Sequence, residues 1–161
     1  MVTVSDRVSE GGRADSSGPA VASTLERAGF RVVQSRVVPD DRSGIEGALR
    51  ELAGSARLVV TTGGTGLGAR DVTPEATMAV VERTVPGLAE AMRAAGRPGT
   101  PTADLSRGVV GVVGTSMVVN LPGNPDGAVE SLNAILPALP HALEDLAGRA
   151  GQHGAHSRGA P

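Results

Sequence analysis

A glycine-rich segment, Thr61-Thr62-Gly63-Gly64-Thr65-Gly66, is the strongest chemical feature of this 161-residue chain. It directly follows a β-branched run of the kind found in buried strands. Glycines let the backbone approach a ligand closely, and their successive N–H groups can form a concave site for an anion. A tight turn would need the same glycines. We favour a ligand-binding loop, because open sheets bind their ligands at the carboxyl ends of strands.

Two aspartates also follow predicted strand ends and could bind a cation. Asp71 lies before a predicted helix start at Thr73-Pro74-Glu75, and Asp40 lies in Pro39-Asp40-Asp41. Mg²⁺ is typically held by one or two carboxylates together with substrate phosphates, so the two acids would suit that ion. Each aspartate also has a purely structural explanation, since Asp71 could form a turn and Asp40 could begin a helix. Glu75 is explained in the same way, because the helix dipole stabilises a carboxylate in the first turn.

Two other polar loops carry candidate binding residues. The first, Pro122-Gly123-Asn124-Pro125, is stiffened by its prolines, and the Asn124 side chain can donate and accept hydrogen bonds. The second, Asp15-Ser16-Ser17-Gly18-Pro19, opens a predicted helix and could hold a phosphate there. A stiff strand-to-helix connection explains the first loop nearly as well, and an N-cap explains the second.

The composition excludes several functional classes. The chain has no Cys, Trp or Tyr, and its 15 basic residues are all Arg. Disulfides, thiolate metal sites, lysine Schiff bases and the lysine of a P-loop are therefore excluded. A single Phe leaves no aromatic platform for nucleic-acid bases. With net charge −2 and no apolar run of membrane-spanning length, we expect a cytoplasmic protein that binds neither nucleic acid nor membrane.

Alternating strands and helices must position these loops. Short β-branched runs predict the strands, and apolar residues at helical spacing predict the helices between them. The order predicts an α/β fold, a three-layer α/β/α sandwich with a mostly parallel sheet, to which residues 109–113 and 116–121 add a small antiparallel hairpin. We expect one domain over residues 1–147 and a disordered tail over residues 148–161.

Capping residues and prolines set the expected bounds of these elements. Ser17 and the Ser43-to-Glu46 capping box mark helix starts, and Pro137 and Pro140 must kink or split the last helix. The predicted strands are residues 2–4, 31–38, 58–62, 109–113 and 116–121. The predicted helices are residues 17–29, 43–54, 73–83, 86–96 and 128–146, with a loop over residues 6–17.

Together the motifs resemble the MogA/MoaB family of molybdenum cofactor biosynthesis, which includes the G domains of the plant and animal fusion enzymes. The resemblance runs from about Thr3 to Leu146 and is carried by GGTG (63–66), RDVTPEAT (70–77) and NLPGNP (120–125), in that order. Residues 3–6, 15–19 and 38–41 match as well. Gly68-Ala69 replaces the more usual Thr/Ser-Pro, and Thr115 stands where many members have Lys or Arg.

The resemblance implies a molybdopterin adenylyltransferase, which transfers AMP from ATP to the terminal phosphate of molybdopterin with Mg²⁺ and releases pyrophosphate. It implies that Asp40 and Asp71 are catalytic and hold the metal. It implies substrate-binding roles for the residues of the polar loops, namely Ser17, Gly18, Thr62, Gly63, Gly64, Thr65, Gly66, Thr73, Pro74, Glu75, Pro122, Gly123, Asn124 and Pro125. The attacking phosphate is already ionised near neutral pH, so this chemistry needs no general base.

A second function stays open, since a MoaB-like relative could bind molybdopterin as a scaffold without efficient adenylyl transfer. A domain of the molybdenum-insertion type is disfavoured, because that relative normally carries additional domains. The family also implies a homotrimer and, as a partner, the downstream molybdenum-insertion enzyme.

Overall fold

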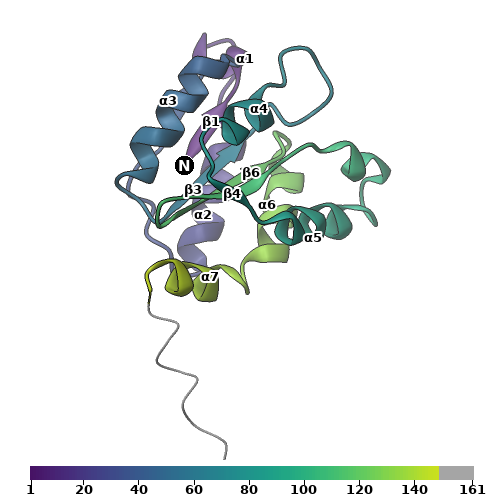
Figure 1. Cartoon of the computed structure of the whole chain (residues 1–161). Helices are drawn as coiled ribbons and strands as arrows, with labels where there is room; N and C mark the ends of the chain where they lie inside the picture. The colour runs from purple at the N-terminus through teal and green to yellow at the C-terminus, as the bar shows by residue number, and fades with distance from the viewer. Residues whose placement is uncertain (149–161) are drawn as a thin grey trace, which may run out of the picture.

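A computed structural model describes residues 1–148, in which six strands form one sheet with helices on both faces (Figure 1). The strands are β1 (Val2–Val4), β2 (Arg36–Val38), β3 (Leu58–Thr62), β4 (Arg83–Thr84), β5 (Val110–Val113) and β6 (Ser116–Leu121). The helices are α1 (Asp6–Ser9), α2 (Ser17–Arg27), α3 (Arg42–Ala53), α4 (Thr73–Met78), α5 (Pro86–Gly96), α6 (Pro125–Ile135), α7 (Leu139–Leu146) and the 3₁₀ helix η1 (Pro101–Leu105). Within these residues, no helix has the length and apolar character that crossing a membrane requires.

The sheet has the strand order β2-β1-β3-β6-β5-β4. Strands β2, β1, β3 and β6 are parallel to one another, whereas β5 is antiparallel to both β6 and β4. This confirms the predicted mostly parallel sheet with an antiparallel hairpin. The strand order reverses between β1 and β3, where open sheets form a crevice. The loops after β1, β2, β3 and β6 therefore leave the same edge of the sheet.

Side chains along the central strands alternate between two apolar layers, because successive residues of a strand point to opposite faces. Val59 of β3 and Val118 of β6 pack with α3 and α4, while Val60 and Val119 pack with α2, α5, α6 and α7. All four valines are fully buried. Helices α3 and α5 accordingly lie on opposite sides of the sheet in Figure 1. The predicted three-layer sandwich is confirmed.

Two segments near the N-terminus differ from the prediction. The strand predicted over residues 31–38 is confined to Arg36–Val38, because its partner β1 offers only Val2–Val4 for pairing. The loop predicted over residues 6–17 contains the short helix α1, which is capped by the Ser5 hydroxyl accepting from Val8 N–H at 3.3 Å. A four-residue helix is too short to leave a periodic apolar pattern.

Of two predicted helices, one divides at its prolines and the other ends earlier than predicted. Pro137 and Pro140 split the last helix into α6 and α7, as expected. The helix predicted to run from Thr73 to Arg83 ends at Met78 instead, and Arg83 lies in β4. The tail predicted over residues 148–161 lies, from residue 149 onward, outside the described residues.

The caps of two helices also differ from the predicted ones. Helix α3 follows Asp41, whose carboxylate accepts from Gly44 N–H at 2.8 Å, so Ser43 is not its cap. The N-cap residue of α2 is Ser16 rather than Ser17, and its side chain makes no capping hydrogen bond. Both polar runs contain several residues with capping chemistry, so sequence alone does not select among them.

Candidate active site

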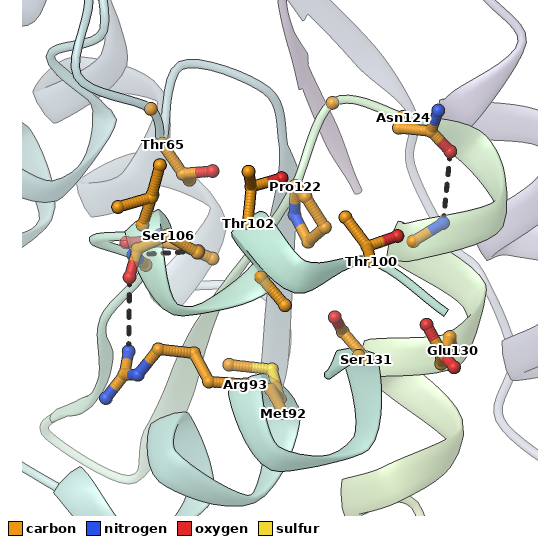
Figure 2. A pocket seen from close by; sticks show the side chains of 18 of the residues that line it. Thr65, Met92, Arg93, Thr100, Thr102, Ser106, Pro122, Asn124, Glu130 and Ser131 are labelled. Carbon is orange, nitrogen blue, oxygen red and sulfur yellow. Dashed lines mark hydrogen bonds between the residues drawn. The ribbon is translucent and has the colours of Figure 1, made fainter. Parts of the chain in front are cut away.

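A cavity of about 970 Å³ opens at the carboxyl edge of the sheet (Figure 2). One wall is formed by residues 63–66, here called the glycine loop, through Gly64, Thr65 and Gly66, and by the loop after β6. The other wall comes from α5, η1 and α6. Small-molecule sites typically have volumes of roughly 300–1,000 Å³. The cavity thus has the size of a ligand site, and two of the predicted polar loops face it.

The glycine loop turns away from β3 through two residues with positive φ, +95° at Gly63 and +63° at Gly64. A Cβ atom on Gly63 would lie 2.2 Å from the carbonyl oxygen of Val4, and one on Gly64 would lie 2.4 Å from Thr73 Oγ1. Glycine is therefore required at both positions. Thr73 fixes this turn, because its hydroxyl donates to Gly63 O at 2.9 Å and its N–H donates to Gly64 O at 3.1 Å.

Asp40 and Asp71 both lie against the glycine loop. A Cβ atom on Gly64 would lie 3.2 Å from Asp40 Oδ1, and one on Gly66 would lie 3.0 Å from Asp71 Oδ2. Asp71 lines the cavity, whereas Asp40 lies beside Gly64 and is not part of the cavity wall. The structure therefore brings both acids to one loop, but only Asp71 to the cavity itself.

Asp40 is held by reciprocal hydrogen bonds with Asp6, which follows β1. Asp6 N–H donates to Asp40 Oδ2 at 2.8 Å, and Asp40 N–H donates to Asp6 Oδ1 at 2.9 Å. Burial raises the pKa of Asp40, and the negative charges of Asp6 and Asp71 raise it further. Arg70 pairs with Asp6 at 2.7 Å and holds the pKa of Asp6 below its usual value. Asp40 is thus a carboxylate in an environment that disfavours its charge.

The carboxylate oxygens of the two aspartates are the kind of ligand that a hard divalent cation prefers. Asp40 Oδ2 accepts from Asp6 N–H, and Asp71 Oδ2 accepts from Gly68 N–H at 2.8 Å. Within residues 1–148, neither Oδ1 atom accepts a hydrogen bond from the protein. The same residues contain no group of three His, Cys, Asp or Glu that could hold a metal alone. Two carboxylates, with the remaining positions left to water or substrate, match the coordination of Mg²⁺.

The start of α2 is a second polar region at this edge, and there the predicted binding residues are buried. Asp15 accepts from Gly18 N–H at 2.9 Å and from Thr3 Oγ1 at 2.7 Å. It also accepts from Ser17 Oγ at 3.4 Å, and Ser17 Oγ lies 3.0 Å from Thr62 Oγ1. Ser17, Gly18 and Thr62 do not line the cavity, and their polar groups are used within the protein.

The loop after β6 forms the rigid side of the cavity. Pro122, Gly123 and Asn124 line it. Asn124 Oδ1 also caps α6, where it accepts from the N–H groups of residues 126 and 127 at 2.9 and 3.1 Å. Figure 2 draws one of these two hydrogen bonds. Pro125 is the first residue of α6 and lies outside the cavity wall. Asn124 is therefore oriented by the helix start behind it.

None of the three predicted residues at the start of α4 lines the cavity, and Thr73 alone among them bonds to the glycine loop. Thr73 and Pro74 are buried. Glu75 is exposed and forms an ion pair with Arg107, which holds the pKa of Glu75 below its usual value. Thr73, Pro74 and Glu75 therefore lie behind the cavity wall and would not touch a ligand in the cavity.

Sequence reasoning missed three residues that organise the site. Asp6 and Asn120 lie within matching motifs, so their positions carried a signal. Asn120 is buried and donates to Thr61 Oγ1 at 3.1 Å and to Thr77 Oγ1 at 2.9 Å. The third residue, Arg107, carried no signal, because a single Arg before a strand is usually on the surface.

The cavity wall carries more negative than positive charge. Asp71, Asp126 and Glu130 line it, and among its described lining residues Arg93 is the one cation. Arg93 donates to Ser106 O at 3.4 Å (Figure 2). A phosphate-bearing ligand would therefore bind most favourably together with a cation.

Comparison with known proteins gives the family context of this site. Residues 1–141 match the family model described as the probable molybdopterin binding domain. The chain is 38% identical over 152 residues to the molybdopterin adenylyltransferase of Helicobacter pylori strain J99, covering 92% of this chain and 86% of that protein. It is 41% identical over 143 residues to the molybdopterin adenylyltransferase of Escherichia coli K12, covering 86% and 73% of the two chains. The solved structure of the molybdopterin biosynthesis enzyme MoaB from Thermus thermophilus matches with a TM-score of 0.86 at 48% identity, covering 91% of this chain and 94% of that one.

Proposed function

This chain belongs to the probable molybdopterin binding domain family, and on that premise we propose that it acts in molybdenum cofactor biosynthesis as a molybdopterin adenylyltransferase. The proposed reaction transfers AMP from ATP to the terminal phosphate of molybdopterin. A phosphate oxygen of molybdopterin forms a bond to the α-phosphorus of ATP. The bond from that phosphorus to its bridging oxygen breaks, and pyrophosphate leaves with the electron pair.

The observation that carries this proposal is the placement of two aspartates around one glycine loop. Asp71 lines the cavity beside Gly66, and Asp40 lies against Gly64 of the same loop. The Asp71 carboxylate is close enough to disfavour the charge of Asp40, since it adds to the effect of burial in raising the pKa of Asp40. A bound divalent cation would relieve that repulsion.

The residues of the chain would act mainly by binding and orienting the two substrates. Asp40 and Asp71 would hold Mg²⁺, which when bound neutralises charge on the triphosphate. The glycine loop lets phosphate groups approach the backbone, because no Cβ stands between them. Gly123 and Asn124 belong to the same wall of the cavity as the glycine loop, and Asn124 is fixed by the start of α6. Positioning of this kind accounts for much of the rate enhancement in phosphoryl-type transfer.

The nucleophile of this reaction needs no general base from the protein. The terminal phosphate of molybdopterin is already ionised near neutral pH. In keeping with this, His141 lies in α7, where it pairs with Asp145 at 3.5 Å, and it does not line the cavity.

Asp71→Asn tests the proposal directly. Asparagine keeps the size of the side chain and can still accept from Gly68 N–H, but it removes the charge. We expect formation of adenylylated molybdopterin from ATP and Mg²⁺ to fall on the order of 100-fold or more, with little change in melting temperature. Pyrophosphate release and mass spectrometry of the product measure this. Asp145→Asn on α7 is the matched control and should leave the rate unchanged.

Two assays of the wild-type protein, molybdopterin binding and adenylate formation, distinguish the transferase from the scaffold function. Binding of molybdopterin without adenylate formation would support a scaffold of the MoaB kind and contradict the proposed transferase. Failure to bind molybdopterin would contradict both. The homotrimer and the transfer of product to a molybdenum-insertion enzyme belong to the same proposal.

A further inference from the structure

Arg107, between η1 and β5, contacts both ends of the segment that carries Asp71. Its Nε donates to Gly66 O at 2.8 Å and its Nη2 donates to Asp71 O at 2.6 Å. Its Nη1 donates to the carboxylate of Glu75 in the first turn of α4, and its own N–H donates to Thr65 O at 2.9 Å. One residue therefore joins the glycine loop, the end of the segment and the helix that follows.

The residues between these contacts, 67–70, have little other support. All four are exposed, and the loop between β3 and α4 projects from the molecule (Figure 1). Within the segment, Asp71 and Gly68 exchange hydrogen bonds, since Asp71 N–H donates to Gly68 O at 2.9 Å and Gly68 N–H donates to Asp71 Oδ2 at 2.8 Å. Arg70 adds an ion pair to Asp6, but the Arg70 side chain is 69% exposed. The position of the segment therefore depends strongly on Arg107.

The three acceptors around Arg107 need a guanidinium group. Its donors are held in one plane at fixed angles, so it can bond two carbonyl oxygens and a carboxylate at the same time. A lysine ammonium would keep the charge but would lack this fixed arrangement of donors. Replacement by lysine therefore separates the geometry of the contact from its charge.

We propose that Arg107 is a positioning residue of the adenylyl-transfer site and sets the Asp71 carboxylate relative to Asp40 by holding both ends of residues 66–71. The inference rests on the proposed function, because the position of Asp71 matters for turnover only if Asp71 takes part in it. Arg107 does not line the cavity and acts through Asp71. Misplacement of a reacting group by about 1 Å can lower a rate on the order of 100-fold.

Arg107→Lys is tested against Arg97→Lys in the full chain. Arg97 pairs with the carboxylate of Asp104 at 3.0 Å, is exposed and does not touch residues 66–71. Amide hydrogen exchange at Gly68 and Asp71, whose N–H groups are hydrogen-bonded within residues 66–71, should become about 10-fold faster or more in Arg107→Lys, with exchange in β3 and β6 unchanged. The MgCl₂ concentration that gives half the maximal rate of adenylyl transfer should rise about 10-fold or more. Arg97→Lys should change neither quantity.

Three results would overturn the inference: exchange unchanged in Arg107→Lys, faster exchange with wild-type rate and Mg²⁺ dependence, or faster exchange that extends to β3 and β6. The second would make Arg107 a support of the loop alone, and the third would indicate a general loss of stability. A wild-type chain that forms no adenylate would contradict the proposed function instead. The exchange experiment would then still decide whether Arg107 holds residues 66–71.

Discussion

The start of α2 and the glycine loop both place carboxylates beside backbone N–H groups at one edge of the sheet, but the two regions use them differently. Asp15, before α2, accepts three hydrogen bonds from groups of the protein. Asp40 and Asp71 each give one oxygen to a backbone N–H and, within residues 1–148, leave the other without a protein donor. An acid can serve a ligand only with the acceptor sites that the fold leaves free.

The two regions also differ in what their charges contribute to the fold. Asp15 satisfies buried donors, so its carboxylate stabilises the start of α2. Asp40 is disfavoured by burial and by its acidic neighbours, so its charge reduces the stability of the fold. Loss of stability at a site that binds charged ligands is a common cost of function.

The largest difference between the regions should appear in turnover after the same substitution at both. Asp40→Asn is expected to lower adenylyl transfer on the order of 100-fold or more, because it removes a charge that would hold Mg²⁺. Asp15→Asn is expected to change the rate by less than about threefold, because its acceptor role is internal. Pyrophosphate release with both substrates measures each rate. A comparable loss in Asp15→Asn would break the comparison and support the predicted binding role of Ser17 and Gly18.

For stability, in contrast to turnover, we expect the larger loss at Asp15, when its side chain is truncated to alanine. Asp15→Ala leaves the buried Gly18 N–H and the Thr3 hydroxyl without their acceptor, which costs about 2 kcal/mol of unfolding free energy. For a chain of this size that corresponds to a fall in melting temperature of roughly 4–8 °C. Thermal melts followed by circular dichroism measure the shift. An unchanged melting temperature would show that the donors find other acceptors or water.

The smallest effect should be a gain in stability for Asp40→Asn. Because the pKa of Asp40 is raised in the folded chain, its ionised form destabilises the fold above that pKa, and the penalty disappears as the pH falls through it. Asparagine removes the charge and can still accept from Asp6 N–H. The variant should melt above the wild type near pH 7, and the difference should shrink on acidification. Melts from about pH 4 to about pH 8 test the sign, and a difference that grows towards low pH would refute it.

The overall fold could be predicted because most elements carry a local signal. The run of β3 is continuously β-branched, and Pro137 and Pro140 mark the break between α6 and α7. The extent of β2 could not be predicted, because it depends on the three residues that β1 offers for pairing. Helix α1 left no pattern, because four residues are about one turn.

The sequence predicts which loops gather at the candidate site, but it does not predict which of their side chains face the cavity. Parallel strands bring Asp40 and the glycine loop to the same edge, which the strand pattern indicates. Which side chains face the cavity depends on contacts in the folded chain, such as the hydrogen bond that Gly18 N–H donates to the Asp15 carboxylate. Arg107 reaches its acceptors from a segment far along the chain, and no local pattern encodes such a contact.

The approach of Gly63 to β1 limits how this sequence can diverge. The atom that any other residue would meet there is the Val4 carbonyl oxygen, at 2.2 Å, and it belongs to a strand paired on both sides. At Gly18 an added Cβ would meet two side-chain oxygens, one of the Asp15 carboxylate at 2.3 Å and the Thr3 hydroxyl at 2.6 Å, and side chains can rotate where a paired strand cannot move. Substitution of Gly18 can therefore be accommodated by rearrangement of neighbouring side chains. At position 63 a change of even one methyl group would have to shift the spacing of the central strands.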